Sequence, residues 1–158
     1  YPVDTEGIVL PDQDFRAAAD DSGTQVYDQY FQVFAGKDGA RPASSVGMAF
    51  GDPRISEAIS LCILLESVKD EFGLKELEIV QEKFTVGPSP YLHVLLTNDA
   101  KKVIWGHAPD KEISGEPSAE DKKNRMIAWL MNEANSSDAK LLDLRTSSSI
   151  IPVANSNY

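Results

Sequence analysis

The chain has 158 residues, of which 42% are hydrophobic and 25% are charged, and it carries a formal net charge of −10 at pH 7. A chain of this length suits one domain that buries roughly 70% of its unfolded surface, so it needs no disulfide or metal to complete its core. The excess of acidic residues repels phosphate backbones and anionic lipid surfaces, which argues against nucleic acid as a partner.

A hairpin is predicted at the start of the chain. Within residues 1–11, short apolar runs flank a turn that contains Gly7. Residues 12–50 are harder to assign, because the apolar run 26–34 shows no clean period and suits either a helix or a strand. Gly, Asp, Ser and Pro residues punctuate this stretch. We therefore predict that 12–50 is an inserted surface elaboration that does not carry the fold.

The first helix is predicted to begin at Gly51-Asp52-Pro53. The Asp52 side chain can cap the free amides of the first turn, and Pro53 suits the first helical position because its missing N–H is not needed there. Gly73 is the predicted stop signal. Helical spacing predicts one buried stripe: Ile55, Ala58, Ile59, Cys62, Ile63, Leu65 and Phe72. Cys62 is the only cysteine, so an internal disulfide is excluded, and its apolar neighbours favour a buried structural thiol.

Three strands are predicted after this helix. Residues 77–80 form the first, and residues 91–105 form a hairpin around an Asn98-Asp99 turn, in which Trp105 is a core residue. The segment Gly87-Pro88-Ser89-Pro90 separates them, and residues 106–117 are predicted to be a loop.

A second helix is predicted from Ser118, where a variant of the capping box places acidic residues in the first turn. It is expected to run to about Asn132 or Ala134. Its predicted buried face consists of Ile127, Leu130, Met131 and Ala134, whereas Trp129 points roughly the other way.

Two extended segments close the chain, at residues 141–145 and 149–153, and residues 154–158 are expected to fray. The order of elements predicts a single α+β domain over residues 1–153, in which two main helices pack against a largely antiparallel sheet.

No catalytic, metal-binding or cofactor-binding residues are predicted. His93 lies in an apolar strand and His107 at a strand end, and neither has the partner spacing of a metal site, so both are assigned structural roles. Ser147-Ser148-Ser149 has no partnered His nearby in the sequence. We therefore predict that the chain is not an enzyme. A hydrolase whose site is assembled from distant residues remains the alternative.

Four segments occur in an order that is similar to one family. They are Val-Asp-x-x-Gly-x-x-x-Pro at 3–11, the turn and Val-x-x-Gly at 98–106, the second helix with Lys122, Lys123, Ile127 and Leu130, and Leu-Asp-Leu-Arg at 142–145. Together they resemble the extracytoplasmic β-domain of the FtsQ/DivIB cell-division proteins. Residues 12–50 are longer than the family's usual connection, and Pro152 removes an N–H from the last strand.

The resemblance implies a non-enzymatic divisome scaffold domain on the extracytoplasmic (periplasmic) face of the bacterial inner membrane. Its parent would be a single-span protein with a POTRA domain. No membrane span or signal peptide is present in this sequence, and because it begins at Tyr1 within a predicted strand, we interpret it as a fragment of that parent. A structural domain of a secreted protein is a further alternative.

The partners implied are other divisome membrane proteins, in particular small coiled-coil proteins with one membrane span. We predict that such a partner adds a strand to the exposed edge of the last strand, residues 146–153. The alternative is that Ile150 and Ile151 only complete the core, since one of two consecutive strand residues faces inward. The predicted contact residues are Arg145, Ser148, Ser149, Ile150, Ile151 and Val153, with Arg145 available to pair with an acidic residue of the partner.

Overall fold

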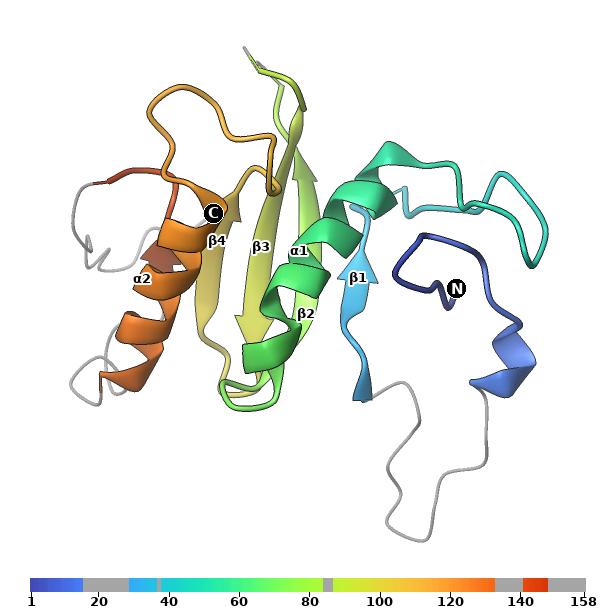
Figure 1. The fold of residues 1–158 in the computed structure, drawn as a ribbon, viewed down its shortest axis with the longest axis horizontal. Helices are drawn as coiled ribbons and strands as arrows, with labels where there is room; N and C mark the ends of the chain where they lie inside the picture. Colours follow the sequence, from blue (N-terminus) through green and yellow to red (C-terminus); the bar gives the residue numbers. More distant parts are fainter. Residues whose placement is uncertain (16–28, 37, 84–86, 133–140, 148–158) are drawn as a thin grey trace, which may run out of the picture.

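The structure is a computed structural model that describes residues 1–15, 29–36, 38–83, 87–132 and 141–147. Its elements, shown in Figure 1, are η1 (Asp12–Asp14), β1 (Gln32–Phe34), α1 (Pro53–Lys69), β2 (Leu74–Gln81), β3 (Tyr91–Thr97), β4 (Lys102–Gly106), α2 (Ala119–Met131) and β5 (Leu141–Asp143). The predicted segment 149–153 and the predicted tail 154–158 lie outside the described residues.

The strands form one sheet in the order β1-β2-β3-β4-β5. The central strands β2, β3 and β4 are antiparallel, whereas each edge strand is parallel to its neighbour. The predicted α+β class with two helices is therefore confirmed, but the sheet is mixed rather than largely antiparallel. The physical reason is that a helix joins each edge strand to the meander, and such a crossover returns the chain to pair in parallel.

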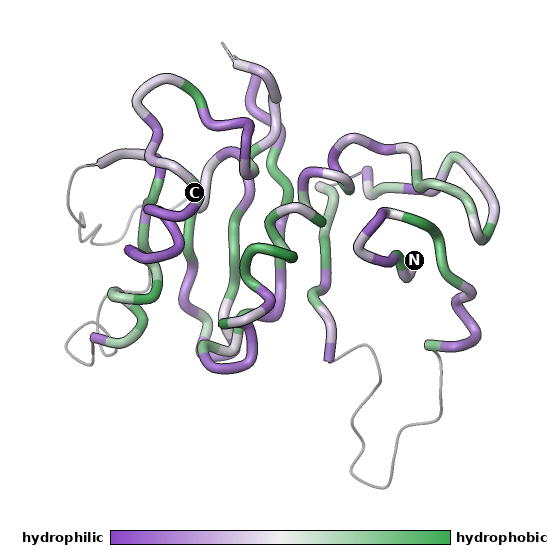
Figure 2. Tube along the Cα trace, viewed as in Figure 1, coloured by the Kyte–Doolittle hydropathy of each residue, from purple (hydrophilic) through white to green (hydrophobic). Residues whose placement is uncertain are grey.

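Both helices pack on one face of the sheet (Figure 1), where they share a single hydrophobic core. The register aligns Leu77, Leu95, Val103 and Leu142 across four strands, and these four side chains are at most 2% exposed. Fully burying a leucine or valine stabilises the fold by about 1.5–3 kcal/mol. The central strand β3 is hydrophobic along most of its length (Figure 2), which suits a strand in the middle of the sheet.

The start of α1 follows the prediction. The Asp52 carboxylate accepts a hydrogen bond from the Arg54 N–H at 2.9 Å, and Pro53 is the first helical residue. The helix ends at Lys69, so Gly73, with φ +59°, lies in the turn beyond the cap.

The buried face of α1 agrees with the prediction at Ile55, Ala58 and Leu65 and differs from it at Ile63. Its buried residues are Ile55, Ala58, Leu61, Leu65 and Lys69, whereas Ile63 is 52% exposed. The prediction was wrong for Ile63 because this residue lies about 140° around the helix from Ala58, at the centre of the face. Burial raises the pKa of the Cys62 thiol to about 12, as expected of a structural cysteine.

The cap of α2 is confirmed, since the Ser118 hydroxyl accepts a hydrogen bond from the Asp121 N–H at 3.2 Å. The predicted face is wrong for Met131, which is 64% exposed, whereas Leu130 packs partly buried against the core and Ala134 lies outside the described residues. The buried residues of the helix are Lys122, Met126 and Trp129. The buried face was not predicted because Lys122 belongs to it, and a lysine at a buried position interrupts the apolar pattern. Trp105 is fully buried, as predicted.

The 12–50 segment contributes to the fold, contrary to the prediction. Its strand β1 pairs with β2 from Gln32 opposite Glu76 to Phe34 opposite Glu78, and Ala35 and Phe50 belong to the core. The sequence pattern concealed this because a strand of three residues is too short to show a period. Residues 16–28 of this segment lie outside the described residues.

Both predicted hairpin turns are present. Near the N-terminus, the Asp4 carboxylate accepts hydrogen bonds from two backbone N–H groups of the turn, Gly7 has φ +78°, and Val3 pairs with Val9 in a single bridge. Between β3 and β4, the Thr97 N–H donates to the Lys101 carbonyl at 3.0 Å. Within the described residues, no helix is long and apolar enough to cross a membrane.

Candidate functional site

The predicted partner-binding residues lie at and after the end of β5. In the part of the chain that the structure describes, β5 pairs only with β4 and is an edge of the sheet. Arg145 is the one predicted contact residue that the structure describes. The others lie outside the described residues: Ser148, Ser149, Ile150, Ile151 and Val153.

The backbone of β5 offers a short outer edge. The Leu144 N–H donates to the Ile104 carbonyl at 2.9 Å, so Leu144 and, by alternation, Leu142 direct their backbone groups toward β4. The backbone groups of Leu141 and Asp143 therefore face outward. The Arg145 N–H is already used, because it donates to the Asp143 carboxylate at 3.0 Å.

Arg145 is bound to Asp143 by its side chain as well. Its Nε and Nη2 donate to the Asp143 carboxylate, and the closest ion-pair distance is 2.6 Å. Burial acts to raise the pKa of Asp143, but the hydrogen bonds and charge of Arg145 together outweigh burial and hold this pKa below its usual value. The Arg145 side chain is still 41% exposed, so its guanidinium lies at the surface with one carboxylate already in place.

A buried ion network lies where β4 ends, and we name its side chains, Glu116, His107 and Lys122, the Glu116 network. Glu116 Oε1 accepts hydrogen bonds from Lys122 Nζ and from the His107 N–H, both at 2.9 Å. Its Oε2 lies 2.8 Å from His107 Nδ1 and 3.3 Å from the Ile113 N–H donor. The three side chains are at most 3% exposed.

Two features of the sequence place this network. Gly106 has φ +95°, and a Cβ at this position would lie 2.1 Å from Glu116 Oε1, so only glycine leaves room for the carboxylate. Lys122 lies one turn into α2 on its inner face. From there Nζ also donates to the His107 carbonyl at 3.0 Å and lies 5.1 Å from the centre of the Trp105 ring.

The charges of the network balance each other. Burial acts to raise the pKa of Glu116, but the hydrogen bonds and charge of Lys122, with hydrogen bonds from His107, lower it below its usual value. The carboxylate is therefore ionised and paired with the Lys122 ammonium. Such a buried pair is costly to break, because removing one partner leaves a charge in the interior.

His93 lies beside the network in β3. Its Nδ1 is 3.3 Å from the Gly106 carbonyl, which makes Nδ1 the protonated nitrogen. Burial lowers the pKa of His93 to about 4, and the charges of Lys122 and His107 act in the same direction. Within the described residues, the Nε2 atoms of His93 and His107 are buried without a hydrogen-bond partner.

This geometry bears on the hydrolase alternative. His107 lies within hydrogen-bond distance of a carboxylate, but both side chains are buried and the carboxylate is neutralised by Lys122. A general base must reach its substrate. Within the described residues, no group of three or more His, Cys, Asp and Glu side chains is placed to hold a metal ion.

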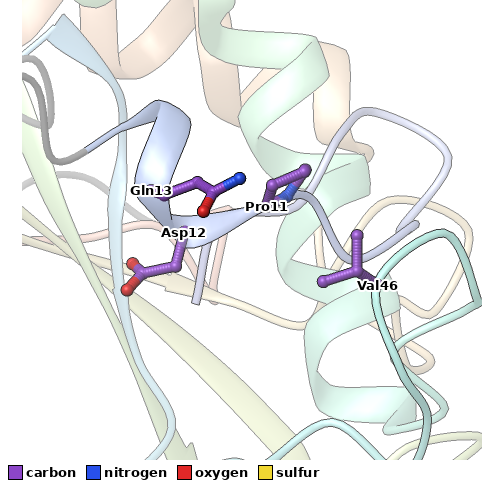
Figure 3. Close-up of a pocket in the computed structure, with 4 residues that line it drawn as sticks. All are labelled: Pro11, Asp12, Gln13 and Val46. Atoms are coloured by element: carbon purple, nitrogen blue, oxygen red, sulfur yellow. The ribbon is translucent and has the colours of Figure 1, made fainter.

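Two surface hollows lie away from the network. One of about 620 Å³ is lined by Pro11, Asp12, Gln13 and Val46, which come from η1 and a facing loop (Figure 3). The other, of about 300 Å³, is lined by Tyr30, Lys69, Asp70, Gly73, Leu74, Lys75 and Asn98. Among the described residues, no histidine, serine or member of the Glu116 network lines either hollow.

The sequence predictions missed the network as a unit. His93 was expected to be a sheet residue and His107 a loop residue, and both positions are correct, but the burial of His107 against Glu116 was not foreseen. One signal was available. Lys122, Met126 and Trp129 have the i, i+4, i+7 spacing of a helix face, which predicts a buried lysine in need of an acid.

Comparison with known proteins finds no family model, curated protein or solved structure that matches this chain. Its function is therefore inferred from its residues and their arrangement.

Proposed function

We propose that this domain is a non-enzymatic scaffold of the bacterial divisome and that a partner protein binds it by adding a strand to the outer edge of β5. Its place would be the extracytoplasmic (periplasmic) face of the inner membrane, within a single-span parent protein. The partner would be another membrane protein of the divisome, such as a small coiled-coil protein with one membrane span.

The observation that carries this proposal is the position of β5. Among the described residues it is an edge strand, and the backbone groups of Leu141 and Asp143 face away from β4. An open edge of this kind is a template for strand addition, in which backbone hydrogen bonds supply affinity and alternate side chains supply specificity.

The resemblance to the FtsQ/DivIB β-domain supports the same edge. Its Leu-Asp-Leu-Arg segment at 142–145 coincides with β5 and the residues that follow it, and its Val-x-x-Gly segment ends β4. The two segments are neighbours in the sheet, since Val103 pairs with Leu142. The similarity therefore lies in the strand pair that presents the edge.

The chemistry of the edge suits a partner segment with an acidic residue. Arg145 places a permanent positive charge beside the last outward-facing backbone groups. Asp143 already occupies part of this guanidinium. A partner carboxylate would bind its remaining donors or displace Asp143, in agreement with the predicted role of Arg145.

The test compares Leu141→Pro with Leu141→Ala. Both remove the leucine side chain, but only proline removes the outward N–H, and the first residue of a strand tolerates proline. The probes are purified extracytoplasmic segments of small coiled-coil division proteins with one membrane span. We expect the alanine variant to bind and the proline variant to lose roughly tenfold in affinity, the effect of one lost hydrogen bond.

Equal binding by both folded variants would exclude the β5 edge. Failure of the unsubstituted domain to bind any of these probes would contradict the divisome function and favour a structural domain of a secreted protein.

A further inference from the structure

We propose that the Glu116 network is a positioning device for Arg145, so that α2 and the loop before it set the guanidinium that faces the partner at the β5 edge. This inference rests on the proposed function for its biological meaning, but the positioning itself is a property of the folded domain.

Gly106 provides the physical connection. A Cβ on Gly106 would lie 2.1 Å from Glu116 Oε1 and 3.0 Å from Arg145 Cγ. The buried carboxylate and the stem of the surface arginine thus both lie within 3.0 Å of the position that a Cβ on Gly106 would occupy. Because glycine places no side chain between them, a shift of Glu116 changes the space that is open to the stem of Arg145.

Charge acts across the same contact. Asp143 is the main cause that raises the pKa of Arg145, burial acts in the opposite direction, and the negative charges of Glu82 and then Glu116 add smaller upward contributions. Glu116 is held in turn by Lys122 Nζ and by two groups of His107. Glu116 Oε1 is therefore held in one place beside the stem of Arg145, while Lys122 neutralises the charge of the carboxylate.

A second contact from α2 holds the chain on the other side of Arg145. Arg125 Nη1 donates to the Thr146 carbonyl at 2.7 Å. Arg125 lies three residues after Lys122 on the same helix. The same helix therefore fixes Glu116 through Lys122 and holds the chain one residue after Arg145 through Arg125.

The chain contains an internal reference for this role. Arg54 closes on Asp52 with the same bonds that Arg145 makes to Asp143: the Nε distances are 3.0 and 3.1 Å and the Nη2 distance is 2.6 Å in both pairs. Arg54 has a different additional anchor, the Ala35 carbonyl at 2.9 Å. A change in the Glu116 network should therefore disturb Arg145 and leave Arg54 unchanged.

The experiment uses the full 158-residue chain labelled with ¹⁵N, with and without the double substitution Glu116→Gln and Lys122→Met. This variant removes both charges together and leaves neither charge buried alone. We expect the Arg145 Nε–Hε signal to shift and its exchange with water to become roughly tenfold faster, as for the loss of one charge-assisted contact. The Arg54 signal should stay unchanged.

The proposal would be overturned if the double variant folds and its Arg145 Nε–Hε signal is the same as that of the unsubstituted chain. Equal shifts of Arg54 and Arg145 would also overturn it, since they would indicate a general loosening. If the double variant does not fold, Glu116→Gln alone keeps the shape and the hydrogen-bond acceptor, and the same two signals decide the outcome.

Partner binding then links the device to the function. With the coiled-coil probes, we expect the double substitution to weaken binding roughly tenfold in a chain that keeps Arg145. In a chain that already carries Arg145→Ala, the double substitution should have no further effect on binding. Equal weakening in both backgrounds would show that the network does not act through Arg145. If Arg145 shifts but no probe binds the unsubstituted chain, the divisome function fails while the positioning role stands.

Discussion

Gly106 and Glu116 are in closer contact than any residue with a side chain at position 106 would allow, because a Cβ there would lie 2.1 Å from Glu116 Oε1. This contact joins the last residue of β4 to the buried charge that holds the β4–α2 loop. Its consequences can be measured by substitution.

Gly106→Ala should destabilise the domain by about 3 kcal/mol, because it adds the strain of φ +95° to the displacement of a buried carboxylate. Gly115→Ala is the matched control. Gly115 has φ +90° but no atom within 4 Å of its Cβ position, so only the backbone strain of about 1 kcal/mol applies. Urea unfolding measures the loss in the free energy of unfolding for each variant. Equal losses for the two variants would mean that Glu116 moves aside without cost.

Lys122→Met should cost about 3–5 kcal/mol in the free energy of unfolding, since it leaves the Glu116 carboxylate buried without its cation. Adding Glu116→Gln should recover part of this loss. The control is Lys101→Met, which breaks a pair of the same 2.9 Å length whose acid, Asp99, is 58% exposed. That change should cost at most about 1 kcal/mol. A similar cost for the two lysines would show that burial does not govern the strength of the pair.

Stability should fall as the pH falls below neutrality because of His93. Its pKa is about 4 in the folded domain and 6.5 without burial, so the unfolded chain takes up a proton that the folded chain resists. The stability is present above pH 6.5 and is lost progressively toward pH 4, by about 3 kcal/mol in all. Urea unfolding at pH 7, 5.5 and 4.5 should show a smaller slope for His93→Gln. The same slope in both would assign the pH dependence to other groups.

Strand β1 can be tested with adjacent residues. Val33 packs against the core and pairs with Leu77, whereas Phe34 is 53% exposed. Val33→Ala should cost about 2 kcal/mol and Phe34→Ala no more than about 0.5 kcal/mol, although the phenylalanine loses more atoms. Thermal unfolding distinguishes these outcomes. A greater loss for Phe34 would indicate that β1 does not face the core as its pairing requires.

Signals contained in a few neighbouring residues were sufficient to predict the local structure. The Asp52 and Ser118 caps, the Gly7 turn and the Asn98-Asp99 turn all occur where the sequence placed them. Each depends on backbone dihedrals and hydrogen bonds within about four residues, which composition and spacing encode directly. The α+β class followed from the order of these elements.

The buried faces of the helices could not be read in the same way. Ile63 and Met131 are apolar yet exposed, and Lys122 is charged yet fully buried. Hydrophobicity predicts which residues can be buried, but the position of the sheet decides which of them are. Lys122 is tolerated because Glu116, six residues earlier, is held beside it by the loop.

By itself, the sequence determined the two helices and their caps, the hairpin turns and the α+β class, because these arise from interactions between near neighbours along the chain. Only the tertiary structure decided that β1 completes the sheet, that Glu116, His107 and Lys122 meet beneath Gly106, and that Arg145 closes on Asp143 at an edge. The reason is physical: a buried charge or an edge strand is defined by what packs against it, and those partners come from distant parts of the chain.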